Sequence, residues 1–265
     1  MKTINKTFRI LFVLIFLFFY CGVNIFTTDE EVKFGENLSK EISKQNKVVT
    51  EGEVFEYVNS LGKKVETICD RKDIKYRFHV IDDSASVNAF ALPGGYIYVY
   101  TGLLLNLDNE AELAGILAHE VGHVVAHHSM KKLTQIYGYS LISGILLGKD
   151  PAFWQKLAGN LFTSMGILAY SRENEYEADS YAIKYMNTLN YDPAEMTGVF
   201  EKFKTLQTRE PGSMEKLLST HPTPSDRIAN AKTLIAGITL NSSLIKNEEQ
   251  YLSIKSKITK SKAKK

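Results

Sequence analysis

The chain has 265 residues, of which 44% are hydrophobic and 23% are charged, and its net charge is +2. This composition is ordinary for a globular protein and supplies one substantial domain plus extensions. The small net charge argues against a nucleic-acid partner. Of the two cysteines, Cys21 lies in an N-terminal apolar run, so an internal disulfide framework with Cys69 is not expected.

The chain begins with a basic stretch followed by an apolar run. Lys2, Lys6 and Arg9 precede the run, which covers residues 10–21 and extends weakly to residue 26. This order is typical of an export signal and predicts that the rest of the chain leaves the cytoplasm. For residues 1–26, a cleaved signal, an uncleaved membrane anchor and a lipoprotein modified at Cys21 all stay open.

Two helices and a strand are expected next. Residues 27–50 and residues 51–69 each carry apolar side chains at helical spacing. Residues 76–81 alternate apolar and polar side chains, which indicates a strand.

Two β-rich runs, residues 87–92 and 96–100, are separated by Pro93-Gly94-Gly95, which predicts a hairpin. The simplest interpretation is ordinary sheet structure. If a metal site lies beside it, the edge of such a sheet can also pair with an extended peptide through backbone hydrogen bonds. The candidate substrate strand consists of Asn88, Ala89, Phe90 and Ala91.

The most informative stretch, residues 113–128, contains the HExxH sequence His119-Glu120-Val121-Gly122-His123. Apolar residues at three- and four-residue spacing predict a mostly buried helix. Positions four apart share a helix face, so His119 and His123 can direct two imidazoles at one Zn²⁺. Glu120 is turned by about 100°, where it can take a proton from a metal-bound water. HExxH also occurs by chance, but buried imidazoles need partners, and a metal would supply one.

Two further histidines follow the motif. His127 is four residues beyond His123, so it is a conceivable third ligand. One straight helix rarely offers three converging ligands, and a solvated or supporting role is favoured for His127 and His128.

Two apolar helical stretches, residues 136–147 and 153–168, come next. Each is too short to cross a bilayer. The two stretches predict either a packed helical hairpin or a surface that lies against a membrane.

An acidic helical segment supplies candidates for a third ligand. Glu175 and Asp179 are four residues apart and share a face, while Glu173 and Glu177 are competing carboxylates. The alternative is a solvated helix start, since negative charge favours a helix N-terminus.

The C-terminal part contains one unusual histidine and a lysine-rich end. His221 precedes a proline-rich turn, which is otherwise an N-capping loop with Ser225 as the cap. From Asn241 on, apolar residues become sparse, and residues 255–265 are lysine-rich without acidic residues. Residues 241–265 are therefore predicted to be a disordered tail.

Taken together, these segments resemble the M48 family of zinc metallopeptidases, and more closely its exported bacterial branch of periplasmic quality-control proteases of the BepA and LoiP kind. The combination is far more specific than HExxH alone, and it covers residues 51–236 approximately. The matching residues, in the family's order, are Asn88–Gly95, Gly102–Leu104, Glu112–Ala114 with Leu117–His123, Ser171-Arg172 with Glu175–Asp179, and Ser219–Pro222 with Arg227.

The resemblance implies a predominantly helical α+β fold. A zincin-like metallopeptidase domain would cover residues 27–240, with a small sheet whose edge strand flanks the HExxH helix. One Zn²⁺ per chain would be held by His119, His123 and Glu175.

The resemblance also implies roles for three further residues. Glu120 would be the general base, and Asp179 would accept a hydrogen bond from a ligand histidine. His221 would approach the metal, either to stabilise the transition state or to gate the site.

The implied function is zinc-dependent endopeptidase activity on unfolded or misassembled exported proteins, on the periplasmic side of a bacterial membrane and attached or close to it. The alternative is a zinc-stabilised binding protein or chaperone with little or latent proteolysis. No helical repeat array is expected after the catalytic domain, so the docking partners of BepA-like members do not transfer. The oligomeric state stays open.

Overall fold

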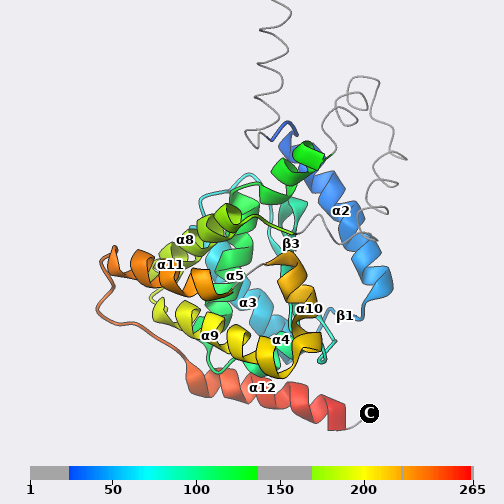
Figure 1. Cartoon of the computed structure of the whole chain (residues 1–265). Coiled ribbons are helices and arrows are strands. Elements are labelled where there is room, and N and C mark those ends of the chain that lie inside the picture. Colours follow the sequence, from blue (N-terminus) through cyan, green and yellow to red (C-terminus); the bar gives the residue numbers. More distant parts are fainter. Residues whose placement is uncertain (1–23, 137–168, 222–223, 264–265) are drawn as a thin grey trace, which may run out of the picture.

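A computed structural model describes residues 24–136, 169–221 and 224–263 of the chain. These residues form helices around one small sheet, which confirms the predicted α+β, predominantly helical class (Figure 1). The helices are α2 (Thr28–Gln45), α3 (Glu53–Ile68), α4 (Thr101–Asn106), α5 (Glu110–Val125), α8 (Arg172–Thr188), α9 (Ala194–Arg209), α10 (Pro211–Thr220), α11 (Pro224–Ala236) and α12 (Glu248–Ala263), and residues 128–136 are also helical.

The sheet has the strand order β1-β2-β4-β3. Strand β4 (Tyr96–Tyr100) runs parallel to β2 (Arg77–Ile81) and antiparallel to β3 (Ala89–Leu92), while β1 (Val48–Val49) pairs with β2 on the other side. Strand β3 is therefore at an edge. The predicted hairpin is confirmed, because the 3-10 turn Pro93–Gly95 joins β3 to β4.

The hairpin turn depends on a glycine. Gly94 has φ 72°, in the left-handed region that side chains other than glycine rarely adopt. A Cβ atom there would also lie 2.7 Å from the Cα atom of Val32 in α2. The turn is thus held closely against α2.

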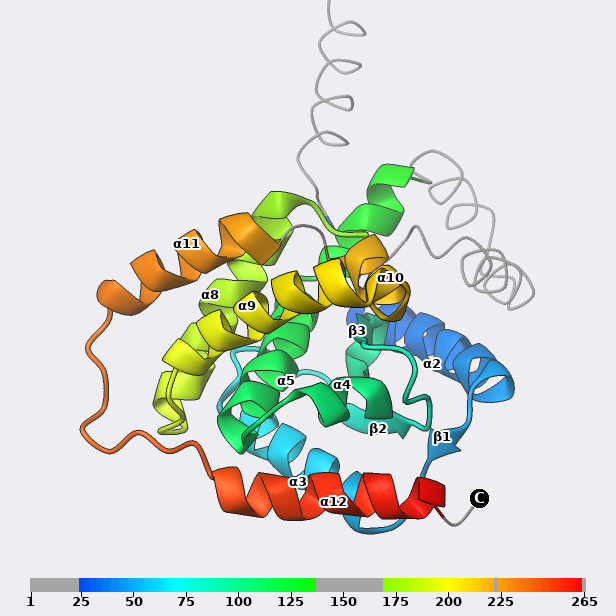
Figure 2. The same cartoon turned by 60° about the horizontal axis from the view of Figure 1, so that its bottom comes forward.

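Helix α5, which carries the HExxH sequence, runs through the middle of the molecule (Figures 1 and 2). Its N-cap is Asn109, whose side chain accepts a hydrogen bond from the backbone N–H of Glu112. All its residues from Glu110 to Val124 are buried. It packs against α8 and α9, and also against α3 and β3.

The contact between α5 and α8 is close because α5 has a glycine at the crossing. A Cβ atom on Gly122 would lie 3.1 Å from the carbonyl oxygen of Ala178 in α8. This close approach brings side chains of the two helices together at the site described below.

Both faces of the sheet are covered. The larger core cluster packs α3, α5, α8 and α9 on one face, and a second cluster fills the space under α2 on the other. The helix predicted over residues 27–50 is confirmed for residues 28–45, whereas Val48 and Val49 form strand β1 instead. The helix predicted over residues 51–69 is confirmed as α3.

Two predicted segments lie partly or wholly outside the described residues. These are residues 1–23 of the N-terminal run and residues 137–168 of the apolar pair. Phe26, assigned above to the N-terminal segment, is buried in the cluster under α2, so the domain already includes it. Within the described ranges, no helix combines the length and the apolar character that crossing a membrane requires.

The prediction of a disordered tail is wrong for residues 248–263, which form α12. This helix lies along α3 and α4, at the front of Figure 2. Its Tyr251 is 1% exposed and donates a hydrogen bond of 2.6 Å to the carbonyl oxygen of Leu104. Composition misled the prediction, because this lysine-rich helix buries Tyr251 and Ile258 against the domain, and Lys255 donates a hydrogen bond to the carbonyl oxygen of Leu107.

We expect Tyr251→Ala to lower the free energy of unfolding by about 3 kcal/mol, as for other buried aromatic side chains. The neighbouring Leu252 is 42% exposed, so Leu252→Ala is the matched control and should change that free energy by less than about 0.5 kcal/mol. Urea unfolding followed by circular dichroism measures both. Equal, small effects would mean that α12 is detached from the domain in solution.

Candidate metal centre

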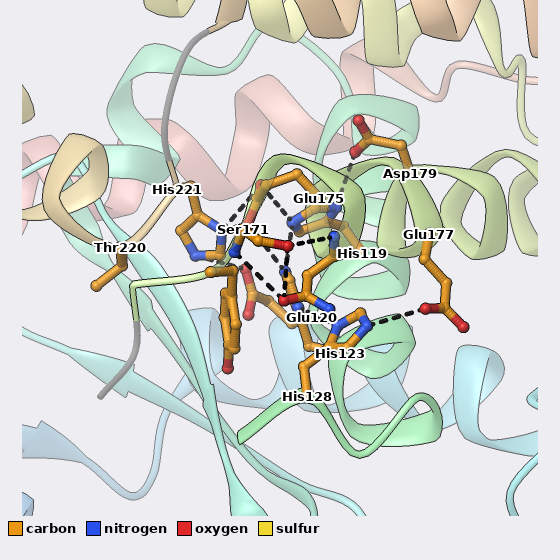
Figure 3. A network of polar contacts seen from close by, with 12 residues as sticks. His119, Glu120, His123, His128, Ser171, Glu175, Glu177, Asp179, Thr220 and His221 are labelled. Carbon is orange, nitrogen blue, oxygen red and sulfur yellow. Dashed lines mark hydrogen bonds and ion pairs between the residues drawn. The ribbon is translucent and has the colours of Figure 1, made fainter. Parts of the chain in front are cut away.

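Three buried side chains from α5 and α8 converge on one point (Figure 3). The Nε2 atoms of His119 and His123 lie 3.0 Å apart. The carboxylate of Glu175 faces both, with Oε2 3.6 Å from His119 Nε2 and Oε1 3.5 Å from His123 Nε2. Together with an atom of His221, all the potential ligand atoms lie within 4.8 Å of one another.

The distances fit a metal ion. A tetrahedral Zn²⁺ with bonds of about 2.0–2.1 Å would hold its ligand atoms about 3.3–3.4 Å apart. The separations in this cluster, 3.0–3.6 Å, bracket that value. Two imidazoles and one carboxylate also form a donor set that catalytic zinc sites use, with the fourth position left open.

Asp179 lies one helical turn beyond Glu175 and contacts the outer side of His119. Its Oδ1 atom is 2.9 Å from His119 Nδ1. Burial would raise the pKa of Asp179, but the charge of Arg227 and the hydrogen bonds from His119 and Arg227 together outweigh burial, so the pKa is lowered. The Asp179 carboxylate accepts a hydrogen bond from His119 Nδ1–H, which leaves the Nε2 lone pair of His119 directed at the cluster.

Arg227 of α11 neutralises the acidic side of this cluster. Its Nη1 atom is 2.7 Å from Glu175 Oε2, its Nη2 atom is 2.6 Å from Asp179 Oδ1, and its Nε atom donates to Asp179 Oδ2 at 2.9 Å. Burial alone would raise the pKa of Glu175, but the charges of His221 and Arg227 outweigh it and lower the pKa. Sequence reasoning gave Arg227 no role. Buried carboxylates signal a counter-charge, but do not identify which of the 32 Lys and Arg residues supplies it.

His128 supports the second imidazole from behind. Its Nδ1 atom is 2.8 Å from His123 Nδ1, and its Nε2 atom is 3.1 Å from Glu177 Oε2. If the Nε2 lone pair of His123 faces a cation, His123 Nδ1–H donates to His128, and His128 Nε2–H then donates to Glu177. Figure 3 shows this chain extending away from the cluster.

The remaining candidates lie outside the cluster. Glu177 contacts His128 and is exposed, and Glu173 is also exposed. His127 points elsewhere, with Nδ1 3.1 Å from Glu31 Oε2 and from Arg71 Nη1.

We expect His128→Ala to weaken zinc binding by about 10- to 100-fold, the usual loss for a residue that orients a metal ligand. His128→Asn should retain most of the zinc affinity, because the asparagine amide oxygen can accept a hydrogen bond from His123 Nδ1–H. The control is His127→Asn, since His127 has φ 56° and asparagine tolerates that conformation. Competition with a fluorescent zinc chelator measures the dissociation constants. Identical constants for His128→Ala and His127→Asn would contradict the supporting role.

Glu120 and His221 lie together on the open side of the cluster. Glu120 Oε1 is 3.6 Å from His221 Nε2, and His221 Nδ1 is 3.0 Å from Glu175 Oε1. Within the described part of the chain, Glu120 Oε2 and His221 Nε2 are buried without a hydrogen-bond partner. Burial raises the pKa of Glu120, which brings this carboxyl closer to the range where a general base works at neutral pH.

Tyr170 is a residue that sequence reasoning missed. Its ring stacks on His123 with 3.9 Å between centroids, and its hydroxyl is 2.8 Å from the hydroxyl of Ser129. Its backbone N–H donates to the carbonyl oxygen of Thr220, next to His221. Tyr170 therefore fixes the His123 ring and links it to the segment that carries His221.

A cavity adjoins His119 and Glu120, and it is also lined by Ala89 of strand β3. Of the four predicted substrate-strand residues, the structure brings Ala89 to this cavity. Asn88, Phe90 and Ala91 are buried nearby along the same edge, and the Phe90 ring stacks on Tyr98 at 5.0 Å.

A convergent pair of histidines and a glutamate, with a second buried carboxylate beside them on an α+β domain, define a metallopeptidase. The chain belongs to peptidase family M48, whose model matches residues 53–235.

Several curated proteins are similar to this chain. The Beta-barrel assembly-enhancing protease of Yersinia pestis is 27% identical over 213 residues, which is 77% of this chain and 43% of that protein. The Beta-barrel assembly-enhancing protease of Escherichia coli (strain K12) is 27% identical over 212 residues, which is again 77% of this chain and 43% of that protein. The Mitochondrial metalloendopeptidase OMA1 of Schizosaccharomyces pombe is 32% identical over 176 residues, which is 65% of this chain and 50% of that protein. The chain thus spans less than half the length of the first two relatives.

Proposed function

We propose that this chain is a zinc-dependent endopeptidase that hydrolyses unfolded or misassembled exported proteins. The observation that carries the proposal is the buried meeting of His119 Nε2, His123 Nε2 and the Glu175 carboxylate at 3.0–3.6 Å. One Zn²⁺ per chain held by these residues would polarise the scissile carbonyl and acidify a water. Side chains of the protein carry out the other steps.

Glu120 acts as the general base. Its Oε2 atom has no hydrogen-bond partner within the described residues, and the carboxyl borders both the cluster and the adjoining cavity. It takes a proton from the attacking water and passes it to the leaving amine. Asp179 and Arg227 hold the ligand side chains in place while this proton moves.

His221 has two candidate roles in this proposal. As a cation beside Glu175 and Glu120, it would stabilise negative charge that develops on the substrate oxygen. In its present position, bonded to Glu175, it would instead occupy the open side of the site and hold the enzyme latent.

The substrate binds in an extended conformation along β3. Edge strands recognise peptides through backbone hydrogen bonds, so pairing of this kind tolerates many sequences and suits unfolded proteins. Ala89 lines the same cavity as His119 and Glu120, so a peptide paired there would pass the cluster.

We place the activity on the exported side of a bacterial membrane, because a basic and apolar N-terminal stretch precedes the domain. The relatives named for β-barrel assembly enhancement are consistent with a substrate among exported proteins. The second candidate function, a zinc-stabilised binding protein with little proteolysis, is favoured by the contact between His221 and Glu175.

Metal removal tests this proposal. We expect purified protein to contain one zinc per chain and to cleave casein, and we expect a chelator to abolish cleavage and added Zn²⁺ to restore it. Zinc without cleavage would favour the binding protein or a latent enzyme. A protein that binds no zinc would refute the site.

A further inference from the structure

A buried ion pair lies near the metal centre without belonging to it. Glu31 of α2 is 1% exposed, and Arg71, in the segment after α3, is 6% exposed. Two hydrogen bonds of 2.9 Å join the Arg71 Nη1 and Nη2 atoms to the two Glu31 oxygens. Burial would raise the pKa of Glu31, but hydrogen bonds with His127, Arg71 and Gly94 and the charge of Arg71 together outweigh burial, so the pKa is lowered. The pair is therefore ionised, and its two-point contact fixes how the carboxylate and the guanidinium face each other.

The pair connects the backbone of the edge strand to the backbone of the HExxH helix. Glu31 Oε1 also accepts a hydrogen bond of 3.2 Å from the backbone N–H of Gly94, in the turn where β3 ends. Arg71 Nη1 also donates a hydrogen bond of 3.0 Å to the carbonyl oxygen of Val124, the residue after His123 on α5. The carboxylate thus holds the end of β3, and the guanidinium holds the end of the helix that supplies two proposed metal ligands.

The turn cannot easily move away from the helix that carries Glu31. A Cβ atom on Gly35 of α2 would collide with the carbonyl oxygen of Pro93, and Gly94 lies equally close to α2. Helix α2 and the turn therefore form one packed unit. A movement of α5 relative to β3 would have to break the hydrogen bonds of Arg71.

The end of α5 does not need Arg71 to satisfy its hydrogen bonds. The carbonyl oxygen of Val124 already accepts a hydrogen bond of 3.1 Å from the backbone N–H of His127. Buried ion pairs also contribute little net stability compared with apolar side chains of similar volume. The main contribution of the Glu31–Arg71 pair is therefore to the geometry between the elements that it joins.

The separation of β3 and α5 decides where a bound peptide would meet the metal. Ala89 of β3 lines the same cavity as His119 and Glu120 of α5, so the strand and the helix both border the site. The Glu31–Arg71 pair joins them at the other end of β3, where it limits a tilt of the strand against the helix. A misplacement of about 1 Å can lower the rate of a reaction about 100-fold.

We propose that Glu31 and Arg71 are positioning residues, which set the separation between the peptide-binding edge of β3 and the metal ligands on α5. The proposal rests on the endopeptidase function above and assigns a role to two residues outside its site. Neither residue touches the substrate or the metal in this proposal. Their effect should therefore appear only with ligands that contact the metal and β3 at the same time.

Two hydroxamates test this role. Acetohydroxamate chelates the metal alone, whereas a hydroxamate at the end of an extended peptide also pairs with the edge of β3. For the zinc-loaded full chain, we expect Arg71→Lys and Glu31→Gln to weaken binding of the peptidyl hydroxamate by about 10- to 100-fold. Lysine cannot form the two-point contact with Glu31, and glutamine removes the charge that holds Arg71. The dissociation constants for acetohydroxamate and for Zn²⁺ should remain those of the wild type. Isothermal titration calorimetry, well below the unfolding temperature of every variant, measures all three.

The matched control is Glu112→Gln. Glu112 is also a buried glutamate that bonds one cation, Lys202, and one backbone N–H, that of Asp108, but it lies at the opposite end of α5. This variant should bind both hydroxamates as the wild type does.

The outcomes separate the positioning role from the endopeptidase function. A loss confined to the peptidyl hydroxamate in the Glu31 and Arg71 variants supports the positioning role even if the wild type cleaves nothing, and only the endopeptidase function then falls. Equal losses for both hydroxamates, or the same selective loss in Glu112→Gln, overturn the positioning role. Casein cleavage by the wild type, with unchanged peptidyl hydroxamate binding in both variants, overturns the positioning role and leaves the function intact.

Discussion

Glu120→Gln is expected to lower kcat by about 10²- to 10⁴-fold, the usual contribution of a general acid–base residue. The amide is nearly the same size as the carboxylate, so the packing of α5 should persist. Glu120 is not among the residues proposed to hold the metal, and the zinc content should therefore stay at one per chain. Casein cleavage and metal analysis on the same preparation measure both quantities.

The matched control for this variant is Glu112→Gln. Glu112 is another buried glutamate of α5, but it bonds Lys202 and the backbone N–H of Asp108 at the far end of the helix. Its substitution should lower the melting temperature while kcat stays close to that of the wild type. Wild-type turnover in Glu120→Gln would show that another group is the base.

Alanine substitution of the three neighbouring glutamates in α8 should separate their roles. Glu175→Ala is expected to weaken zinc binding by more than the roughly 100-fold loss that removal of a supporting residue causes, and to abolish cleavage. It removes a proposed ligand and leaves Arg227 without one of its two carboxylate partners. Isothermal titration with Zn²⁺ measures this loss.

Glu173→Ala and Glu177→Ala are the comparisons for the loss of zinc binding in Glu175→Ala. Glu173→Ala should bind zinc as the wild type does, because Glu173 is exposed. Glu177→Ala should weaken binding only moderately, because Glu177 reaches the cluster through His128. Loss of zinc in Glu177→Ala with retention in Glu175→Ala would reverse the assignment.

Residue spacing along the chain is sufficient to predict the separate elements of the site. Four-residue spacing places His119 and His123 on one face of α5, and the same spacing places Glu175 and Asp179 on one face of α8. The helical period fixes such relations whatever the rest of the chain does. The hairpin at Pro93–Gly95 was equally predictable, because few sequences can form its turn.

Which groups meet across elements depends on how the helices pack in three dimensions. It singled out Glu175 from three nearby carboxylates by burying it against α5, and it turned Glu177 into a partner of His128. The Arg227 contacts join residues about fifty positions apart, so no periodicity reveals them.

The C-terminal helix α12 is another element that the sequence did not predict. Its lysine-rich composition predicted disorder, yet Tyr251 and Ile258 dock it on the domain. Composition averages over a segment, whereas docking depends on whether a few apolar side chains find a complementary surface elsewhere in the chain. The spacing of the site residues within each helix could therefore be predicted from the sequence. Their partners and the adjoining cavity depend on the packing of α5 against α8 and α9, and of α10 against α9.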